Sequence, residues 1–334
     1  MTPKHTGIWA QTLVEALRKR GISDQVIVGN TGISLRALEG DEPKIGFDDL
    51  ALLFERAEEV TGDNLLGFHH AKGLDYRRGG LITYTGVSSP TVRTCLHNLA
   101  RYQRISGDAI ELSTTNLDDH GLIEWHFKVP RSVVRRQYVE FGGTAVVDII
   151  RRLTNRRVTP QKVEFRHFRK TNLKPISRFF SCTVEYGSDE NRITLKQADL
   201  DLPLRSADNQ LYKLLRKFSE EALDTLCPEK PSIVIALEER VAANPGKSQD
   251  DAAKELGMST RTLSRRLTEA GTTYFGVVEA YREAMAKSML AGTDMQFTEV
   301  AYVLGYADAS TFSTAFKRWM GKTPSQYRGT AASR

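Results

Sequence analysis

Residues 248–267 read SQDDAAKELGMSTRTLSRRL, and residues 297–316 read FTEVAYVLGYADASTFSTAF. Both stretches follow one plan, in which a short apolar-periodic helix ends at a glycine and a second helix starts soon after a polar residue. This plan is typical of a helix-turn-helix, whose two helices cross closely at a tight turn. The C-terminal third of the chain is therefore predicted to hold two helix-turn-helix units.

Each unit has the four kinds of residue that the motif needs. A small residue stands where the helices cross, and a glycine supplies the turn. A polar residue caps the second helix, and apolar residues fix that helix to the core. In the first unit these are Ala252 or Ala253, Gly257, Ser259, and Leu263 with Leu267. In the second unit they are Ala301, Gly305, Asp308 or Ser310, and Phe312 with Phe316.

The outward face of each second helix is left short and polar. Arginine there can bind a guanine edge with two hydrogen bonds, and hydroxyl groups can reach bases or phosphates. Cations that follow can bind phosphates, which positions a protein on DNA without specifying sequence. The predicted base-facing residues are Arg261, Thr262, Ser264 and Arg265, and in the second unit Ser310, Ser313 and Thr314 beside Ala309. The predicted phosphate contacts are Lys317, Arg318, Lys322 and Arg328.

The end of the chain resembles a known family. Residues 316–328 read FKRWMGKTPSQYR, and with the rest of 297–328 they closely resemble the signature of the AraC/XylS regulators. Tyr281–Leu290 is similar to the long helix that links the two units of that family. The resemblance covers about 233–328, and two units with this ending argue against a helix pair of an unrelated helical protein.

The resemblance implies two helix-turn-helix units bound to successive major-groove faces on one side of double-stranded DNA. It places five residues at base-reading positions: Arg261, Ser264, Arg265, Ser310 and Thr314. Because the second unit offers only small side chains there, we expect it to contribute affinity more than sequence reading.

The composition is ordinary for a soluble globular protein, with 40% hydrophobic and 26% charged residues. A chain of 334 residues exceeds what one core normally supports, so two or three domains are expected. No stretch approaches the ~20 apolar residues that span a bilayer. The first 17 residues are predicted to form an amphipathic helix, and the three distant cysteines are typical of a reducing compartment. We expect a cytoplasmic protein without membrane association, bound metal or cofactor.

The N-terminal part is predicted to be an α+β sensor domain of helices and an antiparallel sheet, followed by the all-α double helix-turn-helix domain. The predicted divisions are 1–226, a proline-containing linker at 227–232, and 233–334. Helices are predicted over 8–64 with breaks, 91–105, 132–153 and 207–226. Strands are predicted over 81–85, 109–113, 122–127, 163–167 and 192–195, with a turn at 118–121.

The start of the chain resembles the arabinose-binding-like N-terminal domain of the same family. The matching stretches begin at Leu17, at 61–67 and at 201–209. This resemblance implies an effector domain and does not name the effector. Residues 30–38 have the pattern of a third helix-turn-helix, but the acidic stretch 39–42 favours a small packing element.

The densest positive charge lies outside the predicted DNA-binding part. Residues 131–178 hold 13 Lys and Arg against 3 Asp and Glu, whereas residues 231–334 hold 13 against 11. Arg131, Arg135 and Arg136 open this basic segment at the predicted start of a helix, where Arg131 and Arg135 would share a face. Free backbone N–H groups at such a start also favour an anion.

The Arg-x-x-x-Arg spacing is similar to the cyclic di-GMP-binding element of PilZ domains, although the second element of those domains has no clear counterpart here. We therefore predict a small anionic effector, with cyclic di-GMP favoured, bound by Arg131, Arg135 and Arg136. In one alternative these arginines are surface groups paired with acids such as Glu140 and Asp148. In another, the basic stretch faces DNA or an acidic partner.

The function predicted is a sequence-specific transcriptional regulator. As the family leads us to expect, it acts as an activator, works as a homodimer and contacts RNA polymerase. The alternatives are a sugar, fatty-acid or other carboxylate ligand, or a ligand-free regulator controlled by a protein partner. No catalytic signature is visible, so an enzyme is not expected, and turnover by the N-terminal half would revive that class. Adjacent histidines such as His69 and His70 point apart and do not predict a metal pair.

Overall fold

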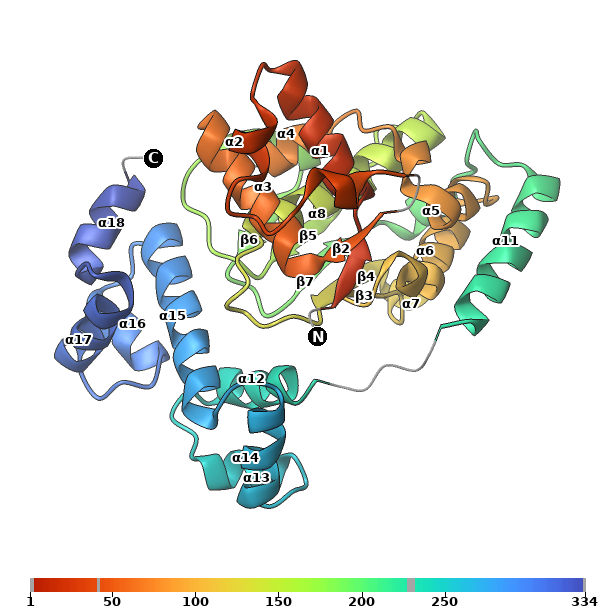
Figure 1. Ribbon diagram of the computed structural model, residues 1–334. Coiled ribbons are helices and arrows are strands. Elements are labelled where there is room, and N and C mark those ends of the chain that lie inside the picture. Colours follow the sequence, from red (N-terminus) through yellow and green to blue (C-terminus); the bar gives the residue numbers. More distant parts are fainter. Residues whose placement is uncertain (1–2, 41–42, 227–231, 333–334) are drawn as a thin grey trace. The chain divides into compact units, whose positions relative to one another are not determined.

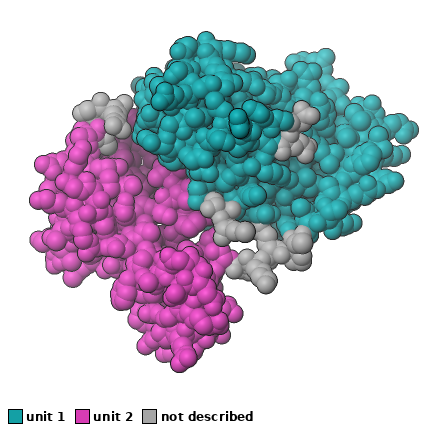
Figure 2. Space-filling model, viewed as in Figure 1, with its two compact units in different colours: residues 1–128, 135–166, 172–228 teal, residues 129–134, 167–171, 229–334 magenta. Residues whose placement is uncertain are grey.

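The computed structural model describes residues 3–40, 43–226 and 232–332. Contacts divide the chain into two compact units, coloured separately in Figure 2. Unit 1 comprises residues 1–128, 135–166 and 172–228, and unit 2 comprises 129–134, 167–171 and 229–334. The predicted linker at 227–232 lies, except for Ser232, outside the described residues.

Unit 1 begins with a helical layer. Its elements are β1 (Lys4–Thr6), α1 (Ile8–Lys19), α2 (Asp24–Val28), a 3₁₀ turn (Leu35–Leu38), β2 (Lys44–Gly46), α3 (Phe47–Thr61) and α4 (Leu66–Ala71). The two short strands, which the sequence did not predict, pair antiparallel with His5 opposite Ile45. Residues 30–38 hold only the 3₁₀ turn, and Leu38 at its end is buried. This stretch is a packing element, because it lacks the second helix of a helix-turn-helix.

The middle of unit 1 is a five-stranded sheet in the order β3-β4-β7-β5-β6. The strands are β3 (Ile110–Ser113), β4 (Leu122–Phe127), β5 (Lys162–Phe165), β6 (Thr183–Tyr186) and β7 (Asn191–Thr194). All neighbours are antiparallel except β5 and β6, which the short helix α9 (Leu173–Phe180) connects. The β3–β4 turn is the helical turn α7 (Leu117–His120), which ends at Gly121 with φ +68°. The mixed α+β class predicted for this part is confirmed.

Helix α8 (Arg136–Thr154) is the central helix of unit 1, and twelve of its residues are buried. Its C-terminal part contributes Val147, Ile150 and Leu153 to the core beside the sheet. Its first turns carry Tyr138 and Phe141, whose rings pack 5.2 Å and 5.1 Å from the ring of Phe54 on α3. The predicted helix began at Ser132, but α8 begins at Arg136. Arg131 and Arg135 therefore do not share a helical face.

The strand predicted over 81–85 is wrong, since these residues lie in α5 (Gly80–Val87). The β-branched and aromatic composition favoured a strand, but tertiary packing decides such short segments. Helix α5 packs against α6 (Val92–Ser106) and α11 (Asn209–Asp224), which lie beside it in Figure 1. The Thr85 hydroxyl donates to the carbonyl of Leu81 at 2.9 Å, as hydroxyl side chains do within helices.

Seven helices in the described part of 229–334 form the bulk of unit 2, and no strand lies among those residues. They are α12 (Ile233–Ala243), α13 (Gln249–Glu255), α14 (Thr260–Glu269), α15 (Tyr274–Gly292), α16 (Phe297–Val303), α17 (Ala309–Met320) and α18 (Pro324–Ala332). The all-α class predicted for this part is confirmed. Among the described residues, no helix is long and apolar enough to cross a bilayer.

Candidate nucleic-acid interface

The first helix-turn-helix consists of α13 and α14. Gly257 has φ +68° in the turn, a conformation that glycine adopts without strain. The Ser259 hydroxyl accepts the Thr262 N–H at 3.2 Å and caps α14. Leu263 and Leu267 are fully buried, so the helix presents its opposite side to solvent.

The second helix-turn-helix repeats this construction with α16 and α17. Gly305 has φ +73°, and a side chain there would meet the backbone of Gly246 at 3.0 Å. The sequence left Asp308 and Ser310 as alternative caps, and the structure selects Asp308, whose carboxylate accepts the Thr311 N–H at 2.7 Å. The backbone and hydroxyl groups of Thr311 hold the pKa of Asp308 below its usual range.

Helix α15 belongs to both helix-turn-helix units. Its first half packs Val277 and Tyr281 into the core of the first unit, and its second half packs Met289 and Leu290 into the core of the second. Met285 lies between and contacts both cores. One continuous helix therefore fixes the spacing of the two helix-turn-helix motifs.

Arg282 of α15 strengthens this connection. Its guanidinium donates to the carbonyl of Pro245, in front of α13, at 2.7 Å, and to the carbonyl of Gly305 at 3.3 Å. The same group lies over the ring of Tyr306 at 4.6 Å. The guanidinium nitrogen Nη2 thus bridges a loop of the first helix-turn-helix and the turn of the second, while the planar group covers the Tyr306 ring.

The predicted base-facing residues of α14 lie on one solvent-facing side. Arg261, Ser264 and Arg265 are exposed, and Thr262 is half-buried beside the cap. Arg265 pairs with Glu269 at 2.9 Å, a surface ion pair that DNA can displace at little cost. Ser264 accepts a hydrogen bond from Gln249 of α13 at 2.8 Å. The structure therefore brings two arginines and a hydroxyl together on this helix.

The corresponding face of α17 carries no cation at its start. Ser310 and Thr314 are exposed, Ser313 is half-buried, and the Thr314 hydroxyl donates to the Ser310 carbonyl at 3.0 Å. Ser310 and Thr314 line a groove shared with residues of α15, among them Phe275, of which 76% is exposed. Each of these hydroxyls can accept or donate a single hydrogen bond, but it cannot form the pair of hydrogen bonds that an arginine forms with a guanine.

The cations after this face divide into two groups. Lys317, Arg318 and Lys322 are exposed, with Arg318 beside the carboxylate of Glu279. Arg328 instead donates to the carbonyl of Met295 at 2.6 Å and lies 4.5 Å from the ring centre of Phe297. Its guanidinium therefore has contacts within unit 2, and the phosphate contact expected of it stays a prediction.

The three arginines predicted to bind an effector have different partners within their own units. Arg131 belongs to unit 2, where its backbone N–H donates to both carboxylate oxygens of Glu238 on α12, at 2.9 Å and 2.7 Å. Its guanidinium lies 5.4 Å from the ring centre of Tyr281. Arg135 belongs to unit 1 and lies 5.0 Å from the ring centre of Phe127.

Arg136 is engaged in a buried charge cluster of unit 1. It donates to Glu58 at 2.5 Å, and each of these two side chains is only 21% exposed. Neighbouring Glu55 accepts the Gln137 N–H at 2.8 Å, and burial raises its pKa to about 7. The sequence did not predict this cluster, because α3 and α8 lie some eighty residues apart and no local pattern links them.

The adjacent histidines have separate partners. His69 Nδ1 lies 2.8 Å from the Asp63 carboxylate, whereas His70 Nε2 lies 3.1 Å from the Thr12 hydroxyl. Burial lowers the pKa of His70 to about 4, so its ring is neutral at ordinary pH. The two rings serve different local contacts.

Comparison with known proteins identifies the class. The arabinose-binding domain of the AraC transcription regulator matches residues 21–204, more than half of the chain, and a helix-turn-helix domain matches residues 252–330. The chain therefore belongs to the AraC family of DNA-binding transcriptional regulators, with an N-terminal domain of the arabinose-binding type.

Its relatives include regulators of similar length. The chain is 24% identical over 322 residues to the ornithine utilization regulator of Pseudomonas aeruginosa, covering 96% of this chain and 95% of that protein. It is 25% identical over 254 residues to the regulator VirS of Mycobacterium tuberculosis, covering 75% and 74%. The crystal structure of the regulator CdpR from Pseudomonas aeruginosa aligns with 96% of this chain and 98% of its own, with 17% identity and a TM-score of 0.43.

Proposed function

We propose that this AraC-family regulator activates transcription by binding a specific DNA sequence through both helix-turn-helix units. The observation that carries the proposal is the exposed pair Arg261 and Arg265 on α14, presented by a rigid capped helix. Each arginine can bind a guanine through two hydrogen bonds, which amounts to about 1–3 kcal/mol of discrimination per base. Lys317 and Arg318 lie in the last turn of α17 and supply phosphate contacts. Activation rests on contact with RNA polymerase in the cytoplasm.

The test is a selection of DNA sites from a random library by the purified full-length protein, followed by titration of the winning site. We expect a defined motif with two parts about one helical turn apart. Binding of winning and scrambled DNA with equal affinity would contradict sequence-specific regulation.

A small anionic effector is the second part of the proposal. Arg156, Arg157, Lys174 and Arg178 of the basic segment are exposed, and within the described residues none of them has a carboxylate partner. Arginines bind phosphate groups with two hydrogen bonds, so cyclic di-GMP remains the first ligand to test. An effector of this kind acts by favouring the DNA-competent arrangement of two copies of the chain.

Calorimetric titration with cyclic di-GMP tests this part separately from DNA binding. Two variants locate the site: Arg131→Ala with Arg135→Ala, and Arg156→Ala with Arg157→Ala. Since the guanidinium groups of Arg131 and Arg135 lie over the rings of Tyr281 and Phe127, we expect the second pair to weaken binding more. No heat from the wild type would exclude the nucleotide and leave a carboxylate ligand, a sugar or control by a protein partner. Because one relative is the ornithine utilization regulator of Pseudomonas aeruginosa, ornithine is the next ligand to titrate.

A further inference from the structure

Phe275, the second residue of α15, is exposed at a place where the surface of unit 2 is hollowed. Its side chain is 76% exposed and lines the groove between α15 and α17. The opposite wall of this groove carries Ser310 and Thr314, which the sequence predicts to face DNA bases. Single exposed apolar residues are common on protein surfaces, so the position of Phe275, and not its exposure alone, indicates a function.

The backbone that carries Phe275 is fixed. The Thr273 hydroxyl accepts the Gly276 N–H at 3.0 Å and caps the start of α15. The neighbouring Tyr274 is buried, and its hydroxyl donates to the carbonyl of Lys247. Phe275 therefore projects from a rigid helix start, and a ligand that contacts its ring does not have to order the backbone first.

The start of α15 follows one recognition helix and faces the other. Helix α14 ends at Glu269, six residues before Phe275, and α17 forms the far wall of the groove (Figure 1). When two such helices enter successive major-groove faces on one side of B-DNA, the minor groove and its two backbones lie between them. DNA held by both helices therefore passes the start of α15 with the segment that joins the two half-sites.

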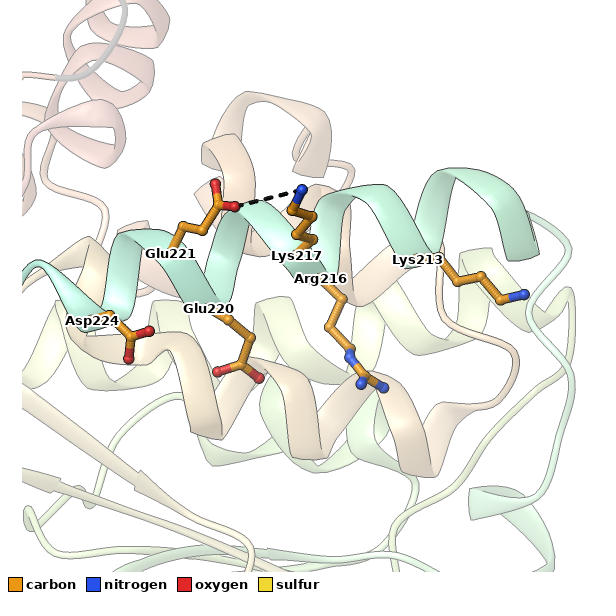
Figure 3. A pocket seen from close by; sticks show the side chains of 6 residues that line it. All are labelled: Lys213, Arg216, Lys217, Glu220, Glu221 and Asp224. Atoms are coloured by element: carbon orange, nitrogen blue, oxygen red, sulfur yellow. Dashed lines mark ion pairs between the residues drawn. The ribbon is translucent and has the colours of Figure 1, made fainter.

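The charge of the groove favours a polyanion. It holds Arg282 and Arg318 against one acid, Glu279, whose carboxylate is already paired with Arg318. A hollow along α11 in unit 1 is a contrast (Figure 3), because its lining has as many acids as cations: Lys213, Arg216, Lys217, Glu220, Glu221 and Asp224. Lys217 and Glu221 of that set pair at 3.8 Å, so its charges offset one another. The charge balance therefore favours DNA at the groove of α15 and α17 and not at α11.

We propose that Phe275 contacts DNA, with its ring packed against the deoxyribose rings that border the minor groove between the two half-sites. A phenyl ring has no hydrogen-bonding group, so it covers the apolar faces of the sugars and responds to the width of the groove, not to base edges. The inference rests on the DNA binding by both helix-turn-helix motifs proposed above, and it adds to that interface a residue outside the recognition helices.

Hydroxyl-radical footprinting of the full-length protein on its selected DNA site tests the contact, because the radicals attack exposed deoxyribose carbons. At saturating protein we expect the wild type to protect both half-sites and the sugars between them. Phe275→Ala should lose the protection between the half-sites and keep the rest. The same pattern in both proteins, or a wild type that leaves the intervening sugars cleaved, overturns the proposal. A wild type that protects no segment overturns sequence-specific binding as well.

The affinity for the same site measures what the ring contributes. Phe275→Ala should bind about tenfold more weakly than the wild type, as expected when a phenyl ring loses its buried contact. Phe275→Leu keeps an apolar side chain and should lose less than about threefold. Tyr302→Ala is the matched control, since Tyr302 of α16 is 84% exposed and lies outside the residues that line the groove. It should bind as the wild type does. Equal losses from Phe275→Ala and Tyr302→Ala, or no loss from Phe275→Ala, overturn the proposal.

The salt dependence of binding separates an apolar contact from an ionic one. A phenyl ring releases no counterions from DNA, so Phe275→Ala should weaken binding by the same factor at every salt concentration. A flatter salt dependence in the variant would mean that the change disturbs ionic contacts such as that of Arg318, and it would overturn the direct contact of the ring. Thermal melting of Phe275→Ala should equal that of the wild type, because the side chain is mostly exposed.

Discussion

The two helix-turn-helix units have the same framework and different surfaces. Each has a left-handed glycine in its turn, a side-chain cap on its second helix and a pair of buried large apolar residues. Yet α14 exposes Arg261 and Arg265, whereas α17 exposes hydroxyl groups, one of which is already bonded to its own helix. The comparison shows that a motif fixed by packing leaves its outer face free, so recognition can be strong in one unit and weak in the other.

The largest expected loss of DNA affinity comes from removing the arginines of the first helix-turn-helix. Arg261→Ala with Arg265→Ala should weaken binding to the selected DNA site by about 100-fold or more, since each bidentate contact provides about 1–3 kcal/mol. Binding to scrambled DNA should fall much less. Fluorescence anisotropy at fixed salt measures both constants, and equal losses on the two DNAs would mean that these arginines contact only phosphate.

A second change tests how Arg282 couples the two helix-turn-helix motifs. Arg282→Lys removes the planar guanidinium that bridges Pro245 and Gly305 and covers the Tyr306 ring, while keeping the charge. We expect affinity for the selected site to fall by roughly tenfold, and preference for one spacing of the two half-sites to weaken, because each well-placed charged hydrogen bond provides about 1.5–3 kcal/mol. Titration of sites with inserted base pairs measures this preference. A spacing preference as sharp as that of the wild type would assign the coupling to α15 alone.

Removing the hydroxyls of the second helix-turn-helix should have little effect on DNA affinity. Ser310→Ala with Thr314→Ala is expected to weaken binding by about fivefold or less, because each neutral hydroxyl contact provides roughly 0.5 kcal/mol, the low end of the range for a hydrogen bond. Sequence preference should be unchanged. A loss as large as that from the arginine pair would contradict the assignment of base reading mainly to α14.

The smallest expected effect is a difference in how the helix caps Asp308 and Ser259 contribute to thermal stability as the pH changes. The carboxylate of Asp308 caps α17 and has a lowered pKa in the fold, so its contribution to stability is present above its ordinary pKa of 3.8 and is lost as pH falls through the lower folded value. The Ser259 hydroxyl cap on α14 has no such dependence. Thermal melts of Asp308→Asn and Ser259→Ala between pH 3 and pH 7 should show a cost for Ser259→Ala that does not change with pH. The melting difference between wild type and Asp308→Asn should shrink only at the acid end.

The sequence predicted unit 2 better than unit 1 because its signals are local. Gly257, Ser259 and Leu263 lie within a few residues of each other and together define one turn and one helix. Most helices and four of the five strands of the larger sheet in unit 1 were also found from periodicity. Residues 81–85 were misassigned because contacts with α6 and α11, distant in sequence, decide their conformation.

The arginine motif shows what local spacing cannot reveal. Arg131 and Arg136 lie five residues apart, but one contacts Glu238 and the other Glu58, and these acids lie on opposite sides of them in the sequence. Neither partner was predictable, since each depends on which helix packs nearby. Charge density alone therefore indicated an anion site at residues whose contacts are largely internal.

Site selection by the wild type and by the Arg261→Ala, Arg265→Ala double variant tests whether the arginines of α14 read the DNA sequence. Both proteins would select DNA from the same random library under the same salt conditions. We expect the wild type to select a motif with one strongly and one weakly preferred part, and the variant to lose the preference in the strong part. An identical motif from both proteins, or no motif from the wild type, would contradict that expectation.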